Sequence, residues 1–231
     1  MLLEGDHALV TGAGNGIGRG IAEALEKEGA KVFRADLAEG DLSRPEGAAK
    51  LGDEAIRKLG KVSIYVHCAS PRRQESQTIK DVKFEEWREM LAVNLDAAFV
   101  LAQKLAKHMI AAQVKGRILL ITSLHAESPR NLPHYSAAKA GQTMLVKELA
   151  RALGPHGIRV NAIAPGAIPG GGFNAPPGMV EKIPLRRFGT PDDVAGMALA
   201  VLSERFGAYV TGSTIVVDGG LALHNWIEPP H

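Results

Sequence analysis

The sequence of 231 residues predicts an α/β protein with a doubly wound parallel sheet in a three-layer α/β/α arrangement. Two observations predict it. Short apolar runs, which suit strands buried on both faces, alternate with longer stretches of helical periodicity. Glycine-rich turns lie at the junctions between the two kinds of segment, where an open α/β sheet binds its ligands.

The composition narrows the class of protein. A hydrophobic content of 45% and a charged content of 23% are typical of a globular chain, and we expect one domain over 1–231. The formal net charge of +2 predicts neither a nucleic-acid nor a membrane partner. A single cysteine, Cys68, and the lack of a leader-like segment predict a cytoplasmic protein. The eight histidines show no His-x-x-x-His spacing, so no metal site is expected.

The first strand and turn predict a phosphate-binding loop. A short apolar strand at 7–10 leads into the turn 11–18, whose glycines follow the pattern Gly12-x-x-x-Gly16-x-Gly18, and then into a helix. A strand, a glycine turn and a helix N-terminus together bring free backbone N–H groups to a phosphate. We therefore favour a Rossmann-like dinucleotide-binding loop over a plain turn.

The second strand, 31–35, ends at Asp36, near the interval at which an acidic residue binds ribose hydroxyls. A carboxylate there would repel a 2′-phosphate, which favours NAD over NADP. Arg34 shares the strand face of Asp36 and keeps NADP open as the less favoured cofactor.

Little chain is left for a third strand. Asp41 follows Asp36 almost at once, and residues 43–46 match a capping box that would start a helix. A parallel crossover needs a dozen or more residues. The third strand is therefore predicted to be short or absent.

The rest of the chain continues the alternation of strands and helices. Asn94, a poor helix former, lies in the middle of one helical pattern. Residues 167–187 are rich in glycine and proline and predict a lid loop. Thr190 starts a helix with a cap, a proline and two acidic residues. Strands are predicted at 62–67, 118–121, 158–163 and 214–217, and helices at 83–112 and 135–153.

Three residues predict an acid–base site. Tyr135 and Lys139 are four residues apart, so a helix places them on one face. A free phenol titrates near pH ~10, and a fixed positive charge beside it is expected to lower that pKa. Ser123 ends a predicted parallel strand and faces the ligand crevice, where it could bond the same substrate oxygen.

Taken together, these motifs resemble the short-chain dehydrogenase/reductase superfamily over essentially the whole chain. The matching pieces are Thr11-Gly-x-x-x-Gly-x-Gly18, Asn94 in Val-Asn-Leu, Ser123, Tyr135-x-x-x-Lys139, Asn161-Ala-Ile-Ala-Pro-Gly166 and Val210-Thr-Gly-x-x-Ile-x-Val-Asp-Gly-Gly220.

The resemblance implies a role for each matching residue. Tyr135 would be the acid/base, and Ser123 would orient the substrate oxygen. Lys139 would lower the tyrosine pKa and bind the nicotinamide ribose, and Asn94 would hold a water that links Lys139 to solvent. The implied cofactor contacts are Gly12, Asn15, Gly16, Ile17, Gly18, Asp36, Asp41, Leu42, Ala69, Tyr135, Lys139, Pro165 and Ile168. Such proteins are usually tetramers, so the helices 83–112 and 135–153 are expected to pack against symmetry mates.

The chain departs from the family pattern at two places. His67-Cys-Ala-Ser70 stands where the family usually has Asn-Asn-Ala-Gly, and Gly170 replaces a threonine that binds the nicotinamide carboxamide. The departures motivate a second function class, a dinucleotide-binding sensor or scaffold with little turnover. The main prediction remains an NAD-dependent oxidoreductase acting on an alcohol or ketone.

The substrate is only partly indicated. The pattern around Ser123 and His125 looks like that of sugar dehydrogenases in the superfamily, which favours a sugar or polyol over a 3-oxoacyl thioester. His125 and Arg130 are the candidate substrate contacts. Arg72, Arg73 and Arg130 lie on predicted loops at strand C-termini and could instead meet an anionic substrate.

Overall fold

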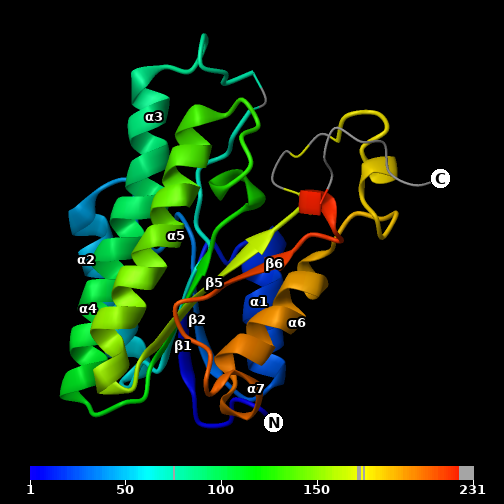
Figure 1. The fold of residues 1–231 in the computed structure, drawn as a ribbon. Helices are drawn as coiled ribbons and strands as arrows, with labels where there is room; N and C mark the ends of the chain where they lie inside the picture. Colours follow the sequence, from blue (N-terminus) through cyan, green and yellow to red (C-terminus); the bar gives the residue numbers. More distant parts are fainter. Residues whose placement is uncertain (75, 171–172, 174, 224–231) are drawn as a thin grey trace.

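A six-stranded parallel sheet forms the centre of the computed structural model, which describes residues 1–74, 76–170, 173 and 175–223 (Figure 1). The strand order is β2-β1-β3-β4-β5-β6. The strands are β1 (His7–Thr11), β2 (Lys31–Ala35), β3 (Ile64–His67), β4 (Arg117–Ile121), β5 (Arg159–Pro165) and β6 (Thr214–Val217). The predicted doubly wound α/β fold is confirmed.

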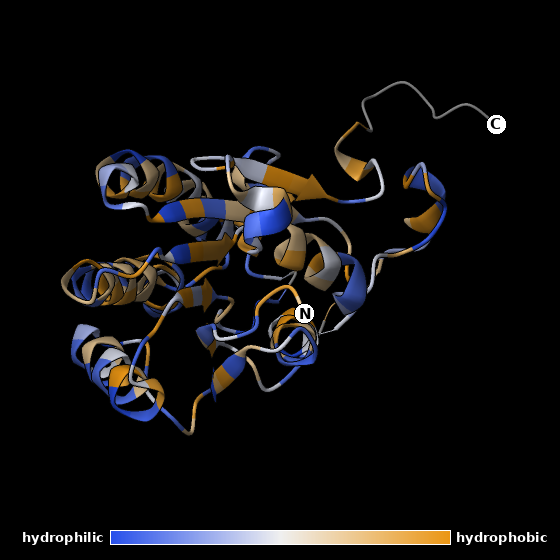
Figure 2. Cartoon of the chain, turned by 90° about the horizontal axis from the view of Figure 1, so that it is seen from below, coloured by the Kyte–Doolittle hydropathy of each residue, from blue (hydrophilic) through white to orange (hydrophobic). Residues whose placement is uncertain are grey.

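Helices cover both faces of the sheet and enclose two apolar cores (Figure 1). One core lies under α2 (Pro45–Leu59), α4 (Ala97–Ala111) and α5 (Pro133–Leu153). The other lies under α1 (Gly16–Lys27) and α6 (Pro191–Leu202). The strands between them are largely apolar, as Figure 2 shows, because burial on both faces leaves no polar side to a central parallel strand. The shorter helices are α3 (Phe84–Leu91), η2 (Leu124–Ala126), η3 (Gly154–His156), η4 (Val180–Lys182), α7 (Glu204–Gly207) and η5 (Leu221–Leu223).

The order of the strands reverses at β1. From β1 the chain moves outward to β2 and then returns to the other side of β1 as β3. The loops after β1 and β3 therefore diverge at the carboxyl edge of the sheet. Such a switch point leaves a crevice where open α/β sheets bind ligands.

The sheet ends at β2, as the short connection predicted. Residues 36–63, all of them described, contain α2 but no further strand. The predicted capping box at 43–46 is wrong. Helix α2 starts at Pro45 with Arg44 as its N-cap, and the Ser43 hydroxyl donates instead to Asp41 Oδ1 (2.6 Å). The Ser43 N–H donates to the same oxygen (2.9 Å), so Ser43 belongs to a local turn closed by Asp41 and lies one residue before the N-cap.

The predicted helix 83–112 contains a π-helical turn. Helices α3 and α4 are joined by η1 (Ala92–Asp96), in which Asn94 is fully buried. Asn94 Nδ2 donates to the carbonyl oxygen of Met90 (3.0 Å). A π turn inserts one residue into the helix and is often found at functional sites. The unusual asparagine therefore marks a local change of helix geometry.

The predicted cap at Thr190 is confirmed, and it forms half of a capping box at the start of α6. The Asp193 N–H donates to Thr190 Oγ1 (3.2 Å), and Asp193 Oδ2 accepts the Thr190 N–H (2.7 Å). Arg187 pairs with both oxygens of Asp193, so hydrogen bonds from Arg187 and Thr190 hold the pKa of that carboxyl far below its usual range.

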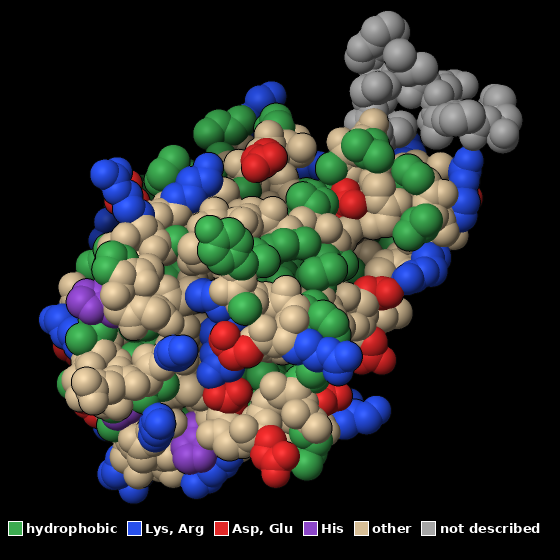
Figure 3. All heavy atoms as spheres, turned by 60° about the horizontal axis from the view of Figure 1, so that its bottom comes forward, with side chains coloured by type: hydrophobic (Ala, Val, Ile, Leu, Met, Phe, Trp, Pro, Cys, Tyr) green, Lys and Arg blue, Asp and Glu red, His purple; other side chains and the backbone are tan. Residues whose placement is uncertain are grey.

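The described surface is mixed in charge on the face drawn in Figure 3, where basic and acidic side chains are interspersed. Among the described residues, no helix has both the length and the apolarity needed to span a membrane. Within the same residues no cluster of three His, Cys, Asp or Glu side chains could hold a metal ion.

Candidate active site

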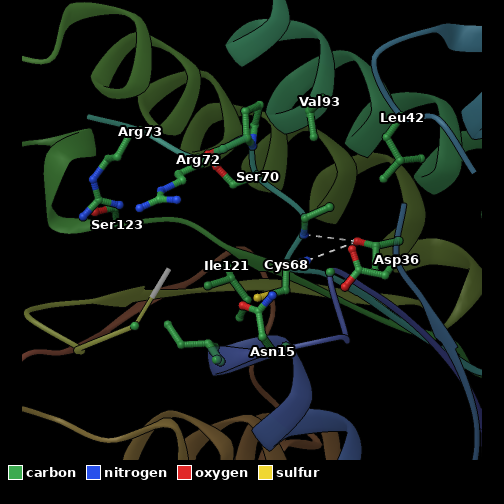
Figure 4. A pocket seen from close by; sticks show the side chains of 18 of the residues that line it. Asn15, Asp36, Leu42, Cys68, Ser70, Arg72, Arg73, Val93, Ile121 and Ser123 are labelled. Atoms are coloured by element: carbon green, nitrogen blue, oxygen red, sulfur yellow. Dashed lines mark hydrogen bonds between the residues drawn. The ribbon is translucent and has the colours of Figure 1, made fainter. Parts of the chain in front are cut away.

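A cleft of about 1020 Å³ opens at the switch point of the sheet. Figure 4 shows its two ends: Asp36 and Leu42 lie at one, and Arg72, Arg73 and Ser123 at the other. The structure brings together in this cleft most of the predicted site: Gly12, Asn15, Gly16, Ile17, Gly18, Asp36, Asp41, Leu42, Ala69, Ser123, Tyr135, Lys139, Pro165 and Ile168. Asn94, His125 and Arg130 do not line it.

The glycine turn leaves room for a phosphate and supplies donors for one. Helix α1 begins at Gly16 with Asn15 as N-cap, and no side chain caps its first N–H groups. These groups are free to bind an anion, and the helix dipole favours one there. Gly12 has φ +66°, and a Cβ on it would lie 2.8 Å from the backbone of Ala69. Only glycine therefore lets the two loops meet at this edge.

Asp36 is held at the adenosine end of the cleft by the glycine turn itself. The Gly14 N–H donates to Asp36 Oδ2 (2.8 Å), and the Leu37 N–H donates to Oδ1 (2.9 Å). Because β1 and β2 are neighbours in the sheet, the end of β2 is beside the turn that follows β1. The carboxylate still lines the cleft and has lone pairs left for a ligand.

Arg34, the residue that kept NADP open, points away from this cleft. Its Nε and Nη2 donate to Glu26 (3.0 and 2.6 Å), and Glu23 lies 3.9 Å from Nη1. Both glutamates belong to α1, and Arg34 does not line the cleft. The sequence could not reveal this, because both glutamates approach through tertiary packing of α1 on β2.

Ser123 and Tyr135 form the reacting corner of the cleft. Ser123 follows β4 and its oxygen accepts the His125 N–H (3.3 Å), which leaves the hydroxyl proton to donate elsewhere. Tyr135 lies in the first turn of α5, and its side chain is buried. The His125 ring meets the Tyr135 ring edge to face, with 5.1 Å between centroids.

Burial raises the pKa of Tyr135, and the Arg73 charge and a hydrogen bond with Ser123 oppose the rise. The sequence predicted that Lys139 would lower this pKa. The structure differs for a physical reason: Lys139 is itself buried, and burial lowers its own pKa to about 7. A lysine that is partly neutral at pH 7 has only a weak electrostatic effect on the pKa of Tyr135. The cation closest to the phenol ring in the described chain is Arg73, 4.7 Å from its centroid.

Lys139 is joined to Asn94 through Gln142, a residue that the sequence did not single out. Lys139 Nζ donates to the Ile121 carbonyl oxygen (2.8 Å) and to Gln142 Oε1 (3.1 Å). Gln142 Nε2 donates in turn to the carbonyl oxygen of Asn94. Its spacing in the sequence could have identified Gln142, because a polar side chain three residues after Lys139 lies on the same helix face.

His67, one of the departures from the family pattern, ties β3 to the π turn. Its Nε2 bonds the carbonyl oxygen of Val93 (3.0 Å) and must therefore carry the proton. Its Nδ1 then accepts from Tyr65 Oη (2.7 Å), and Thr11 Oγ1 lies 3.3 Å away. Burial, with a smaller effect of the Lys139 charge, lowers the pKa of His67 to about 3. The ring is neutral and structural.

His67 should make the protein sensitive to acid. Its folded pKa is depressed, so the unfolded chain binds more protons between pH 3 and 6.5, and stability falls as pH falls through that window. By pH 4.5 the loss is about 3 kcal/mol. Urea unfolding at pH 7.5 and 4.5 should show that His67→Asn loses less stability than the parent. Equal losses in the two proteins would contradict this account.

Two further departures from the family pattern, Cys68 and Gly170, take no direct part in the chemistry. Burial raises the pKa of Cys68 to about 11, so the thiol is not a nucleophile at neutral pH. Gly170 lines the cleft with φ +139°, a conformation that strains any other residue. A threonine could not take its place without a change of backbone. The predicted lid, 167–187, contains η4, and residues 171, 172 and 174 of it lie outside the described residues.

The predicted substrate contacts, His125 and Arg130, do not line the cleft. Burial lowers the pKa of His125 to about 4, and the charges of Arg73 and Arg130 lower it further. Arg130 is exposed and acts on this corner only through its charge. His125 is therefore a neutral ring against Tyr135.

Comparison with known proteins assigns the family. Residues 33–222 match the family model described as "Enoyl-(Acyl carrier protein) reductase". The chain is 33% identical to glucose 1-dehydrogenase 2 of Bacillus subtilis, over 96% of each chain. It is 31% identical to the 3-oxoacyl-[acyl-carrier-protein] reductase of Synechocystis, over 94% of this chain and 96% of the other. A solved short-chain type dehydrogenase/reductase from Mycobacterium marinum covers 95% of this chain, and 96% of its own, with a TM-score of 0.84 and 31% identity.

A doubly wound sheet with a glycine turn at its switch point is the architecture of a dinucleotide-binding oxidoreductase. The chain belongs to the short-chain dehydrogenase/reductase superfamily. Its members use nicotinamide cofactors, NAD or NADP.

Proposed function

We propose that the protein is an NAD-dependent oxidoreductase that interconverts a small alcohol and its ketone, with Tyr135 as the acid/base and a sugar or polyol as the favoured substrate. One observation carries the proposal: Ser123, Tyr135 and Lys139 line one end of the cleft whose other end holds the glycine turn and Asp36. A bound nicotinamide dinucleotide supplies the hydride acceptor or donor.

Each residue of the reacting corner has a defined task. In the direction of oxidation, Tyr135 Oη accepts the proton of the substrate hydroxyl, and in reduction it returns one. The Ser123 hydroxyl, which is hydrogen-bonded to Tyr135 in this structure, would turn to the substrate oxygen and orient it between the two hydroxyl groups. Lys139 is held by the Ile121 carbonyl and Gln142, and its remaining N–H would bind a ribose hydroxyl of the cofactor.

The preference for NAD rests on the adenosine end. The Asp36 carboxylate lines the cleft, whereas Arg34 is paired with α1 and does not. A 2′-phosphate placed beside Asp36 would meet a like charge in a partly enclosed site. The glycine turn carries Asn15 in place of a basic residue that could compensate.

The cofactor preference should change on substitution of Asp36. In Asp36→Arg, the ratio of kcat/KM with NADP to that with NAD should rise by roughly 100-fold, which corresponds to about 3 kcal/mol for one repulsion removed and one charged hydrogen bond gained. Arg34→Gln is the control and should leave the ratio within about twofold, because its charge is paired with α1. A parent protein that prefers NADP would overturn the proposal of NAD.

The substrate class has one competitor. The family model and one of the relatives are named for acyl-carrier-protein reductases, which favours a 3-oxoacyl thioester. The relative named glucose 1-dehydrogenase 2 favours a sugar. Absorbance of NADH at 340 nm across sugars, polyols and acetoacetyl thioesters distinguishes the two. The absence of turnover by any alcohol or ketone, with NADH binding retained, would leave a sensor or scaffold.

We also propose a homotetramer built on the helices 83–112 and 135–153. Phe99 on α4 and Met144 on α5 are large apolar side chains exposed in the single chain, at 44% and 56%. The two helices lie side by side on one face of the sheet (Figure 1). Association would remove this apolar surface from water. Light scattering should give the mass of four chains, and Phe99→Glu should reduce it.

We also propose a cytoplasmic location. It is supported by the single cysteine, which precludes an intrachain disulfide. Fractionation of the source cells with an antibody against the protein tests it.

A further inference from the structure

Two arginines stand at the reacting end of the cleft. Arg72 and Arg73 follow Ser70 in the loop after β3, and both line the cleft. Figure 4 shows their guanidinium groups directed into it, on the side where Ser123 lies. The Cζ atom of Arg73 is 4.7 Å from the centroid of the Tyr135 ring, so its guanidinium lies next to the acid/base.

Neither arginine has an acidic partner among the described residues. Within the described part of the chain, no carboxylate oxygen comes within 4.0 Å of Arg72 or Arg73, and Glu89, which also lines the cleft, pairs with neither. Arg72 is exposed and Arg73 is half-buried, but the Nε atom of Arg73 is enclosed by protein and has no hydrogen-bond partner among the described residues. Buried polar donors are normally satisfied.

Two neighbouring groups, His125 and Cys68, add no negative charge. Burial and the charges of Arg73 and Arg130 lower the pKa of His125 to about 4, so the ring is neutral at pH 7. Burial raises the pKa of Cys68 to about 11, so the thiol is protonated. Asp36 lies at the opposite end of the cleft (Figure 4). The reacting end therefore carries two guanidinium groups that no carboxylate of the described residues pairs with, Glu89 included.

We propose that the substrate bears an oxyanion, a carboxylate or a phosphate, close to the reacting carbon, and that Arg73 binds it with Arg72 beside it. This rests on the proposed oxidoreductase function. A guanidinium presents parallel N–H donors that match either oxyanion. Because Arg73 stacks on the ring of Tyr135, the oxyanion and the reacting oxygen are only a few bonds apart. Within the proposed class of small alcohols, the substrate is then an anionic one, a sugar acid, a sugar phosphate or a small hydroxy acid, which binds better than the neutral sugar or polyol of the same size.

The test compares matched neutral and anionic substrates. Kinetics with the cofactor would use glycerol, glycerate and glycerol 3-phosphate, and then D-glucitol, D-gluconate and D-glucitol 6-phosphate. For the parent, kcat/KM should be at least roughly tenfold higher with one of the two anionic classes than with the neutral compound. In Arg73→Gln this preference should fall by roughly 10- to 100-fold, and Arg73→Lys should be intermediate. The Arg73 charge also affects the pKa of Tyr135, but this changes the rate with every substrate equally. It therefore cancels in the ratio of kcat/KM for the anionic substrate to that for the neutral substrate.

The controls separate the causes. Arg151→Gln removes an exposed charge in the last turn of α5 and should leave the preference unchanged. Arg72→Gln should lower it less than Arg73→Gln. The carboxylate and phosphate series identify which oxyanion is bound. A parent without preference, or an Arg73→Gln variant that retains it, would overturn the inference while turnover of alcohols still supports the proposed function.

A second measurement keeps the two proposals distinct. Calorimetric titration of the protein with D-gluconate and D-glucitol 6-phosphate, with NAD present, measures binding without turnover. One of the anions should bind the parent more tightly than D-glucitol and should lose roughly tenfold in affinity in Arg73→Gln. If no alcohol is oxidised but this difference is found, the oxyanion site stands and the proposed reaction fails. If neither anion binds better than D-glucitol, the oxyanion site is rejected.

Discussion

Replacing Tyr135 with phenylalanine is expected to lower kcat/KM by roughly 10³- to 10⁴-fold, the contribution of a positioned acid/base. The change removes only the hydroxyl, so the buried ring keeps its edge-to-face contact with His125 and its contact with Arg73. Initial rates at 340 nm measure the loss. Quenching of protein fluorescence by NADH should give a Kd within a few-fold of that of the parent.

The matched control for that substitution is Tyr209→Phe, which removes the same group from a fully exposed side chain. It should leave kcat/KM unchanged. If Tyr135→Phe retained more than a tenth of the parent activity, the acid/base would have to be another group. Loss of NADH binding in the same variant would instead indicate a distorted cleft.

Replacing Lys139 with methionine, a neutral side chain of similar length, is expected to lower kcat/KM by roughly 10²- to 10³-fold. The variant also tests the electrostatics of the cofactor-free protein. Burial lowers the pKa of Lys139 to about 7 in the folded state, whereas the unfolded chain holds that proton up to its ordinary value. Between those two values the unfolded state binds more protons, so stability rises with pH.

The predicted size of this linkage is about 3 kcal/mol between pH 7 and pH 9, present in the parent and lost in Lys139→Met. Urea unfolding at the two pH values measures it. The change in the free energy of unfolding between pH 7 and pH 9 is compared in the parent and the variant, so that the titration of all other groups cancels. Lys147→Met, at an exposed position on the same helix, is the control and should show the parent behaviour. A parent and a Lys139→Met variant with the same pH dependence would contradict a depressed lysine pKa.

Several features could be predicted because they are local in the chain. The apolar runs predicted the strands, since a strand buried on both faces must be continuously apolar. The short span after Asp36 predicted the missing strand, because a crossover has a minimum length. Thr190 predicted the start of α6, since a cap bonds a backbone N–H three residues away.

Other features were wrong or missed because they depend on contacts between distant segments. Ser43 matched a cap pattern, but it lies in a turn closed by Asp41, and α2 starts at Pro45 with Arg44 as its N-cap. Arg34 matched a cofactor contact, but α1 supplies two glutamates that hold it elsewhere. The tyrosine pKa was expected to respond to Lys139, because the spacing is local. Spacing does not report that this lysine is buried. Burial lowers the pKa of Lys139, and Arg73 lies nearer the tyrosine ring, at 4.7 Å from its centroid against 5.5 Å for Lys139 Nζ.

The sequence by itself determined the class of fold, the glycine turn, the order of the elements and the identity of the groups that line the cleft, because these follow from periodicity and from residue chemistry. The tertiary structure alone decided which cations face the cleft and how strongly each buried group holds its proton. The physical reason is that electrostatic energy depends on burial and on distance between segments that lie far apart in the chain.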